Sequence, residues 1–160
     1  MDTKLKWCFK QKKGIKIVSP SDNLCEIYLQ KSKEALNATI VNAKAKIFSW
    51  AVSASYYAKY FSIYALLSKI GIKSEIHECT IEAFSFLFKD TVGEDMISDI
   101  KTSKNERIEF QYYTKMNEKI DAEKLIENTR DFINKIEELI DSLTEEIIHE
   151  MRNKLELAIK

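Results

Sequence analysis

Apolar residues recur along most of this chain at steps of three and four, the spacing of a helix that buries one face. The longest such seam lies in residues 44–70, and Gly71 follows it as a helix-ending residue. Further stripes predict helices over residues 21–42, 77–88, 93–113, 121–140 and 144–159, with N-cap oxygens at Ser21 and Asp121. The pattern predicts an all-α fold, an antiparallel up-and-down bundle of four main helices plus a short C-terminal helix.

The first 19 residues have a different pattern. Apolar and polar residues alternate on both sides of the turn KQKKG, and a period of two predicts a β-hairpin. Because a lone hairpin is marginally stable, we expect Trp7 and Ile17 to lie against the helical body. We therefore divide the chain into an N-terminal hairpin extension, residues 1–19, and a helical bundle domain, residues 20–160.

Composition argues against several classes of protein. Lys59 and Lys69 interrupt the most apolar stretch, so no transmembrane helix is expected, and the N-terminus lacks the apolar core of a secretory signal. These features predict an intracellular, cytoplasmic protein. Cys8, Cys25 and Cys79 are far apart and contain no CxxC pair, which predicts reduced thiols and neither a disulfide framework nor a zinc site.

The charges balance overall but are unevenly distributed. Lys and Arg number 25, as do Asp and Glu, and a formal net charge of zero argues against a general electrostatic clamp on nucleic acid. Residues 1–16 are nevertheless rich in lysine, and residues 118–150 are rich in acidic side chains. A binding role would therefore depend on local patches.

Motifs for metal or cofactor chemistry are missing. The chain has no GxGxxG, GxxxxGK[ST], HExxH or GxSxG, and it lacks the Glu-x-x-His pairs on two helices that a di-iron bundle needs. We therefore predict no metal and no cofactor. His77 lies beside Glu75 and Glu78, which would favour its protonated form, and both a packing role and a catalytic role stay open for it.

The predicted helix over residues 44–70 is apolar around much of its circumference. It carries an aromatic stripe of Trp50, Tyr57, Tyr60 and Tyr64 beside small residues. A helix with so broad an apolar surface must be covered, either by the core of its own chain or by a second copy. The second interpretation predicts a homodimer with these four residues in its interface.

Arg107 lies five residues before the pair Tyr112 and Tyr113, in the stretch ERIEFQYYT. One interpretation is a surface arginine that pairs with a glutamate or stacks on a tyrosine. The other is a contact with phosphate or base, because a guanidinium matches phosphate oxygens and tyrosines stack on bases.

Three motifs in succession resemble the HEPN superfamily, in particular its small prokaryotic branch. They are the A-x-Y-Y-A stretch over residues 54–58, the K-x-G-I-K turn over residues 69–73 and His77 at the start of the next helix. The similarity covers residues 21–140. It implies a bundle of four or five helices, usually homodimeric and often encoded beside a minimal nucleotidyltransferase in toxin and antitoxin pairs.

Active members of this superfamily are metal-independent ribonucleases with an R-x4-6-H motif, in which the arginine holds the scissile phosphate and the histidine takes the 2′-hydroxyl proton. The resemblance places that arginine at Arg107. The motif histidine is absent, because Tyr112, Tyr113 and Thr114 occupy the positions five to seven residues later. A tyrosine, with an ordinary pKa near 10, is a poor base at neutral pH. Ile108 also replaces a residue that is typically polar in active members.

The sequence thus predicts a non-catalytic HEPN-type protein that binds RNA, a nucleotide or a nucleotidyltransferase partner in a system resembling a toxin and antitoxin pair. The binding residues would be Arg107, Tyr112 and Tyr113. One alternative is an active, metal-independent ribonuclease toxin whose base is Tyr112 or His77, the latter brought in from another helix. A second alternative is a purely structural interaction module, so enzymatic activity stays open at this stage.

Overall fold

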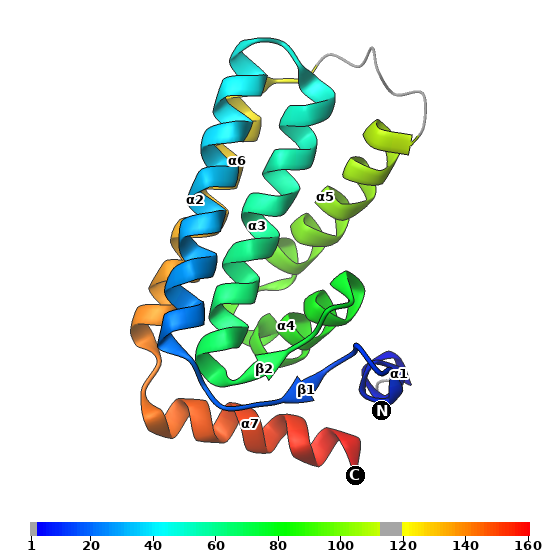
Figure 1. Cartoon of the computed structure of the whole chain (residues 1–160), viewed down its shortest axis with the longest axis vertical. Coiled ribbons are helices and arrows are strands. Elements are labelled where there is room, and N and C mark those ends of the chain that lie inside the picture. The colour runs from blue at the N-terminus through cyan, green and yellow to red at the C-terminus, as the bar shows by residue number, and fades with distance from the viewer. Residues whose placement is uncertain (1–2, 113–119) are drawn as a thin grey trace.

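The computed structural model describes residues 3–112 and 120–160, nearly all of them in helices (Figure 1). The elements are α1 (Thr3–Lys10), β1 (Lys16–Ile17), α2 (Asp22–Lys44), α3 (Phe48–Ile70), β2 (Ile72–Lys73), α4 (His77–Val92), α5 (Glu94–Tyr112), α6 (Ala122–Ser142) and α7 (Glu145–Ile159). The predicted all-α bundle is confirmed.

Helix α3 is the central element of the bundle. It packs against α2 along most of its length and also contacts α4, α5, α6 and α7. In Figure 1, α2, α3 and α5 run along the long axis, α6 lies behind α2 and α3, and α7 crosses the end of the bundle near α1. Because α3 is surrounded on several sides, most of its residues are buried, which explains its broadly apolar sequence.

Local sequence signals set the helix ends. The Ser21 and Asp121 side chains each accept a hydrogen bond from a backbone N–H of the following turn, at 3.1 Å, as expected for N-caps. Thr144 caps α7 in the same way. Gly71 ends α3 with a φ of 78°, in the left-handed region that glycine adopts without a steric penalty.

The N-terminal segment differs from the predicted hairpin. Residues 3–10 form α1, and β1 pairs in antiparallel fashion with β2, which follows α3 in the chain. A helix suits this segment because it places Leu5 and Cys8, three residues apart, on one face that is fully buried. Ile17 packs against the core as predicted, whereas the Trp7 side chain is 48% exposed, so its predicted position was wrong.

Cysteine pairing also differs from the prediction. Cys8 of α1 and Cys79 of α4 form a disulfide between buried side chains 71 residues apart in sequence. Spacing along the chain could not indicate this pair, because only the packing of α1 against α4 brings the two Cα atoms within 5.5 Å. Cys25 is a free, buried thiol, and burial raises its pKa to about 11.

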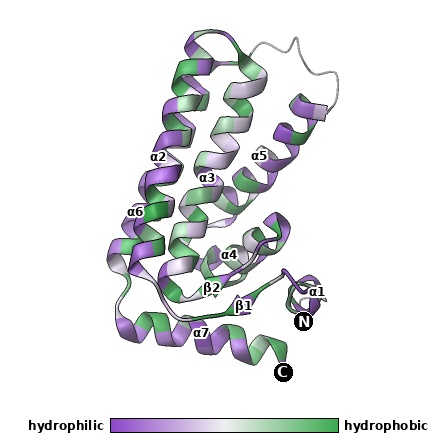
Figure 2. Ribbon diagram, viewed as in Figure 1, coloured by the Kyte–Doolittle hydropathy of each residue, from purple (hydrophilic) through white to green (hydrophobic). Residues whose placement is uncertain are grey.

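Helix α5 is unbroken and largely hydrophilic (Figure 2). Its described buried residues are Ile97, Ile100, Ser103 and Phe110, and the other side chains face outward to varying degrees. Helix α5 therefore presents a polar surface beside the apolar α3.

Within the described part of the chain, no helix combines the length and the apolar character that crossing a membrane requires.

A buried ion pair joins α5 to α3. Lys59 is 2% exposed, and its Nζ donates hydrogen bonds to both carboxylate oxygens of Asp99, at 2.9 and 3.1 Å, and to Ser103 Oγ at 2.9 Å. Burial lowers the pKa of Lys59, and the Asp99 carboxylate opposes that effect. All three ammonium protons thus have partners, which is what a lysine in this position requires.

Candidate functional site

Arg107 is anchored on α5 against two tyrosines of α3. Its Nη1 donates a hydrogen bond to the Tyr57 hydroxyl at 2.8 Å. Its Cζ lies 5.1 Å from the centre of the Tyr56 ring and 5.4 Å from that of Tyr57, within range of a cation–π interaction. The guanidinium is therefore held by neutral aromatic partners, a different arrangement from a surface ion pair.

His77, the first residue of α4, contacts the same tyrosine pair. The Tyr56 hydroxyl and His77 Nδ1 are 2.8 Å apart and share a hydrogen bond. The imidazole also stacks on the Tyr60 ring, with centres 4.1 Å apart and planes 13° from parallel. The tyrosines of α3 thus join Arg107 of α5 to His77 of α4 in one cluster, which we call the Arg107 cluster: Tyr56, Tyr57, Tyr60, His77 and Arg107.

The surroundings of His77 favour a neutral imidazole. Partial burial lowers the pKa of His77, and the positive charges of Arg107 and Lys104 lower it further. The prediction that neighbouring glutamates would favour the protonated form was therefore wrong. The reason is that both glutamates pair with lysines instead. Glu78 pairs with Lys4 and Lys104, and Glu75 pairs with Lys13 and Lys73.

Tyr56 is fully buried, and burial raises its pKa well above the ordinary value for a phenol. Its hydroxyl therefore keeps its proton and can either donate to His77 Nδ1 or accept from it. When Nδ1–H donates to Tyr56, the lone pair of Nε2 is free to accept a proton. The cluster thus holds a neutral histidine that can act as a base.

One buried donor of the cluster has no partner among the residues that the structure describes. Arg107 Nε is buried, and no hydrogen-bond acceptor lies near it among the described residues. An unpaired, buried guanidinium N–H is costly, and an anionic oxygen would satisfy it. This atom is the strongest local indication that the cluster accepts an anion.

The other predicted site residues lie elsewhere. Tyr112, at the end of α5, is 72% exposed and shares a hollow of about 370 Å³ with Trp50, while Tyr113 lies outside the described residues. The structure therefore brings Arg107 together with His77, and no contact joins Arg107 to Tyr112 among the residues described. The prediction did not include Tyr56 as a site residue, although its A-x-Y-Y-A stretch was a signal for it.

The aromatic residues of α3 divide between the core and the surface. Tyr57, Phe61 and Tyr64, at helical spacing, are half-buried, and Trp50 is 63% exposed. Tyr60 is 5% exposed and packs inside its own chain, so it offers little surface to a partner. The outward stripe of α3 therefore consists of Trp50, Tyr57, Phe61 and Tyr64.

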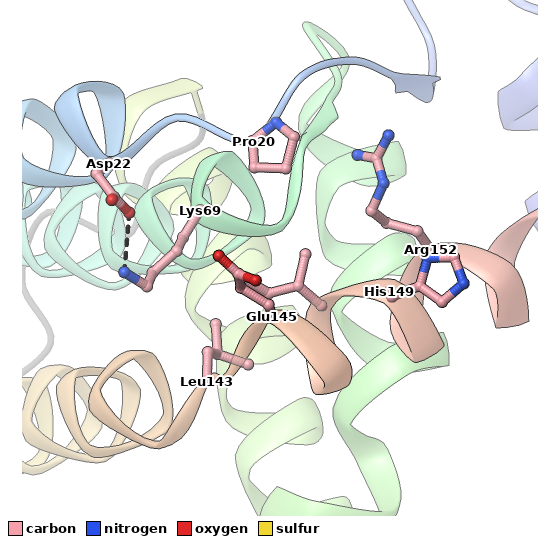
Figure 3. A pocket seen from close by; sticks show the side chains of 8 residues that line it. Pro20, Asp22, Lys69, Leu143, Glu145, His149 and Arg152 are labelled. Atoms are coloured by element: carbon pink, nitrogen blue, oxygen red, sulfur yellow. Dashed lines mark hydrogen bonds and ion pairs between the residues drawn. The ribbon is translucent and has the colours of Figure 1, made fainter.

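Another hollow lies away from this cluster, between α7, the start of α2 and the end of α3 (Figure 3). It measures about 480 Å³, but its cations Lys69 and Arg152 already bind other groups of the same chain. Lys69 pairs with Asp22 at 2.9 Å, and Arg152 Nη1 donates to the carbonyl oxygens of Val18, Ile70 and Gly71. We therefore assign these side chains a structural role, in which Arg152 holds α7 against the end of α3.

In the segments that the structure describes, no three His, Cys, Asp or Glu side chains gather where they could share a metal ion. The Arg107 cluster itself offers a guanidinium, an imidazole and tyrosine hydroxyls.

The family model for the HEPN domain matches residues 25–139. The chain belongs to the HEPN domain family. A search among curated proteins found no match. The matched HEPN region begins in α2 and ends in α6, so it contains the whole Arg107 cluster, whereas α1, β1 and α7 lie outside it. Membership in this family is evidence for a role connected with RNA or nucleotides.

Proposed function

We propose that this HEPN-domain protein binds RNA at the Arg107 cluster without cleaving it. The observation that carries the proposal is the buried Arg107 Nε, which lacks a partner among the described residues while Nη1 is fixed on Tyr57. A phosphate oxygen would satisfy this donor, and the half-buried Tyr57 ring next to it offers a face on which a base can stack.

Two features support binding without cleavage. The histidine expected a few residues after the arginine in active members is replaced by tyrosines. Tyr112 is mostly exposed at the end of α5, outside the cluster, and Tyr56 holds its proton too firmly to act as a base. Neither tyrosine would then replace the motif histidine, so a base for the 2′-hydroxyl would have to come from His77.

Replacing Arg107 with alanine is expected to weaken RNA binding by roughly 1–3 kcal/mol, about 5- to 150-fold, because a charge-assisted contact is lost. Fluorescence anisotropy with a labelled single-stranded RNA would measure the effect. Arg130→Ala is the matched control, since Arg130 is an exposed arginine on α6. Equal affinities of Arg107→Ala and Arg130→Ala would contradict the proposal.

Cleavage is the second candidate, and it is favoured by the proximity of a neutral His77 to Arg107 through the two tyrosines. His77 would take the 2′-hydroxyl proton, the 2′ oxygen would attack phosphorus, and the 5′ oxygen would leave and take up a proton from water. Metal-free cleavage of RNA by the purified protein, lost in His77→Ala and in Arg107→Ala, would establish this activity in place of binding alone.

We also propose that two copies associate through the start of α3 around Trp50, which would leave Tyr57, Phe61 and Tyr64 of the outward stripe to the RNA. Light scattering is expected to give a mass near twice 18.6 kDa. Trp50→Glu should shift the protein toward monomer, because Trp50 is 63% exposed and a buried charge would oppose association. A monomer at micromolar concentrations in the unsubstituted protein would contradict this proposal.

A nucleotidyltransferase partner and a setting like that of a toxin and antitoxin stay predictions from the resemblance.

A further inference from the structure

We propose that the ligand is a single-stranded polynucleotide whose successive phosphates follow a basic track along α5, from Arg107 through Lys104 to Lys101, into a second phosphate subsite between α1, α4 and α5. This inference rests on the proposed RNA-binding role and adds to it a subsite and a requirement for more than one phosphate.

The three cations of the track are evenly spaced. Lys101, Lys104 and Arg107 follow one another at steps of three residues on one unbroken helix. Each step advances about 4.5 Å along the axis and turns the side chain by about 60°, so the track covers about 9 Å and winds around α5. A single phosphate group is too small to reach both ends.

The first two cations of the track, Arg107 and Lys104, lie near the same ring, the imidazole of His77. Arg107 and Lys104 both lower the pKa of His77, so both charges lie close to the imidazole. Lys104 Nζ is 3.7 Å from Glu78, which also pairs with Lys4 of α1. Lys104 therefore connects the Arg107 cluster to the start of α4, where Glu78 neutralises part of its charge.

The far end of the track is a hollow of about 200 Å³. Lys4, Lys101, Lys104 and Asn105 line it, together with Glu78, Glu82 and Ile81. Three lysines thus face two carboxylates: Glu78 pairs with Lys4 at 2.5 Å and with Lys104 at 3.7 Å, and Glu82 lies 3.9 Å from Lys4 Nζ. The hollow keeps an excess of positive charge and an amide donor, which suits a phosphate.

Lys101 is the member of the hollow best placed to bind a ligand. Its side chain is exposed, and it makes no hydrogen bond or ion pair with any residue in the described segments. Its ammonium can therefore turn to a phosphate without breaking an internal contact, and the long Lys104–Glu78 pair can rearrange at little cost.

Successive phosphates occur in a polynucleotide and in a nucleoside triphosphate. The half-buried rings of Tyr57, Phe61 and Tyr64 on α3 favour the polynucleotide, because they extend away from the cluster and several unpaired bases can pack on their exposed parts, beside Tyr28 of α2, which already contacts Phe61 and Tyr64. Paired bases cannot use these faces, so the strand is single.

The test is competition fluorescence anisotropy with a labelled eight-nucleotide single-stranded RNA, using uridine monophosphate, ATP and the matching duplex as competitors. The double variant Lys101→Ala and Lys104→Ala is expected to weaken binding of the labelled strand about tenfold at low salt and to make its salt slope less steep by about 1.4, the value for two lost phosphate contacts. Binding of uridine monophosphate should not change, because one phosphate needs Arg107 alone.

Matched controls separate this inference from the proposed function. Lys33→Ala with Lys135→Ala removes two exposed lysines from α2 and α6 and should leave affinity unchanged. Lys101→Gln, at a side chain with no described partner to lose, should weaken strand binding without lowering the melting temperature.

If Arg107→Ala weakens strand binding while the α5 double variant behaves like the lysine control, the track is overturned and the proposed function stands. Competition by ATP or by the duplex as strong as that by the single strand also overturns the inference. If Arg107→Ala binds the strand with unchanged affinity and unchanged specificity, the proposed function itself is overturned.

Discussion

Replacing Asp99 with alanine is expected to lower the free energy of unfolding by about 3 kcal/mol, because it leaves the Lys59 ammonium buried without its counter-ion. Lys59 is 2% exposed, whereas 28% of the Asp99 side chain is exposed, so water reaches only one end of the pair. Ser103 Oγ would remain as a hydrogen-bond partner for Nζ, with the Phe132 ring 5.7 Å away and Glu106 acting at longer range. Urea denaturation at pH 7 measures the loss.

A double-mutant cycle tests the reason for this loss. Lys59→Met combined with Asp99→Ala removes both charges and is expected to be clearly more stable than Asp99→Ala alone. If the two substitutions were additive, the ion pair would not be the source of the effect. Ser98→Ala is a control for alanine at a neighbouring, exposed position of α5.

The same pair predicts a pH dependence. Burial lowers the pKa of Lys59 in the folded protein below its value in the unfolded chain, so the unfolded chain binds more protons between these two values. Stability therefore rises with pH through this alkaline interval. The rise should begin at lower pH in Asp99→Ala, because the carboxylate that supports the protonated lysine is gone, and urea midpoints measured between neutral and alkaline pH would follow it.

Gly71→Ala is expected to be the second strongly destabilising change, with a loss of about 2–4 kcal/mol. Gly71 has a φ of 78°, and a Cβ at this position would collide with the Val18 carbonyl oxygen and lie 2.8 Å from Pro20 N. Both atoms belong to backbone that cannot move aside easily, because Val18 N–H donates to the Gly71 carbonyl oxygen and Arg152 clamps the same turn.

Gly93→Ala provides the comparison. Gly93 also has a positive φ, of 84°, but a Cβ there would meet no atom within 4 Å. This variant therefore carries the backbone strain without the collision and should lose less stability than Gly71→Ala. Thermal melting of the two variants side by side would test the argument, and a larger loss in Gly93→Ala would contradict it.

Much of the bundle could be predicted from the sequence because the signals for a helix are local. Ser21, Asp121 and Gly71 mark helix ends through contacts within one turn, and the apolar stripes mark the buried faces. The N-terminal segment was harder, because its short apolar pattern fits both a period of two and a helix that buries Leu5 and Cys8.

The sequence by itself determined the helices from residue 21 onward, most of their ends and the resemblance to the HEPN family, since each depends on neighbouring residues or on motifs in order. Only the tertiary structure decided which side chains distant in sequence come into contact. Tyr57 and Arg107 are 50 residues apart, Tyr56 and His77 are 21 apart, and Cys8 and Cys79 are 71 apart. Such contacts arise because α4 and α5 pack against α3 and α1 packs against α4. Burial then lowers the pKa of His77, whereas its neighbours in the sequence had suggested a raised pKa.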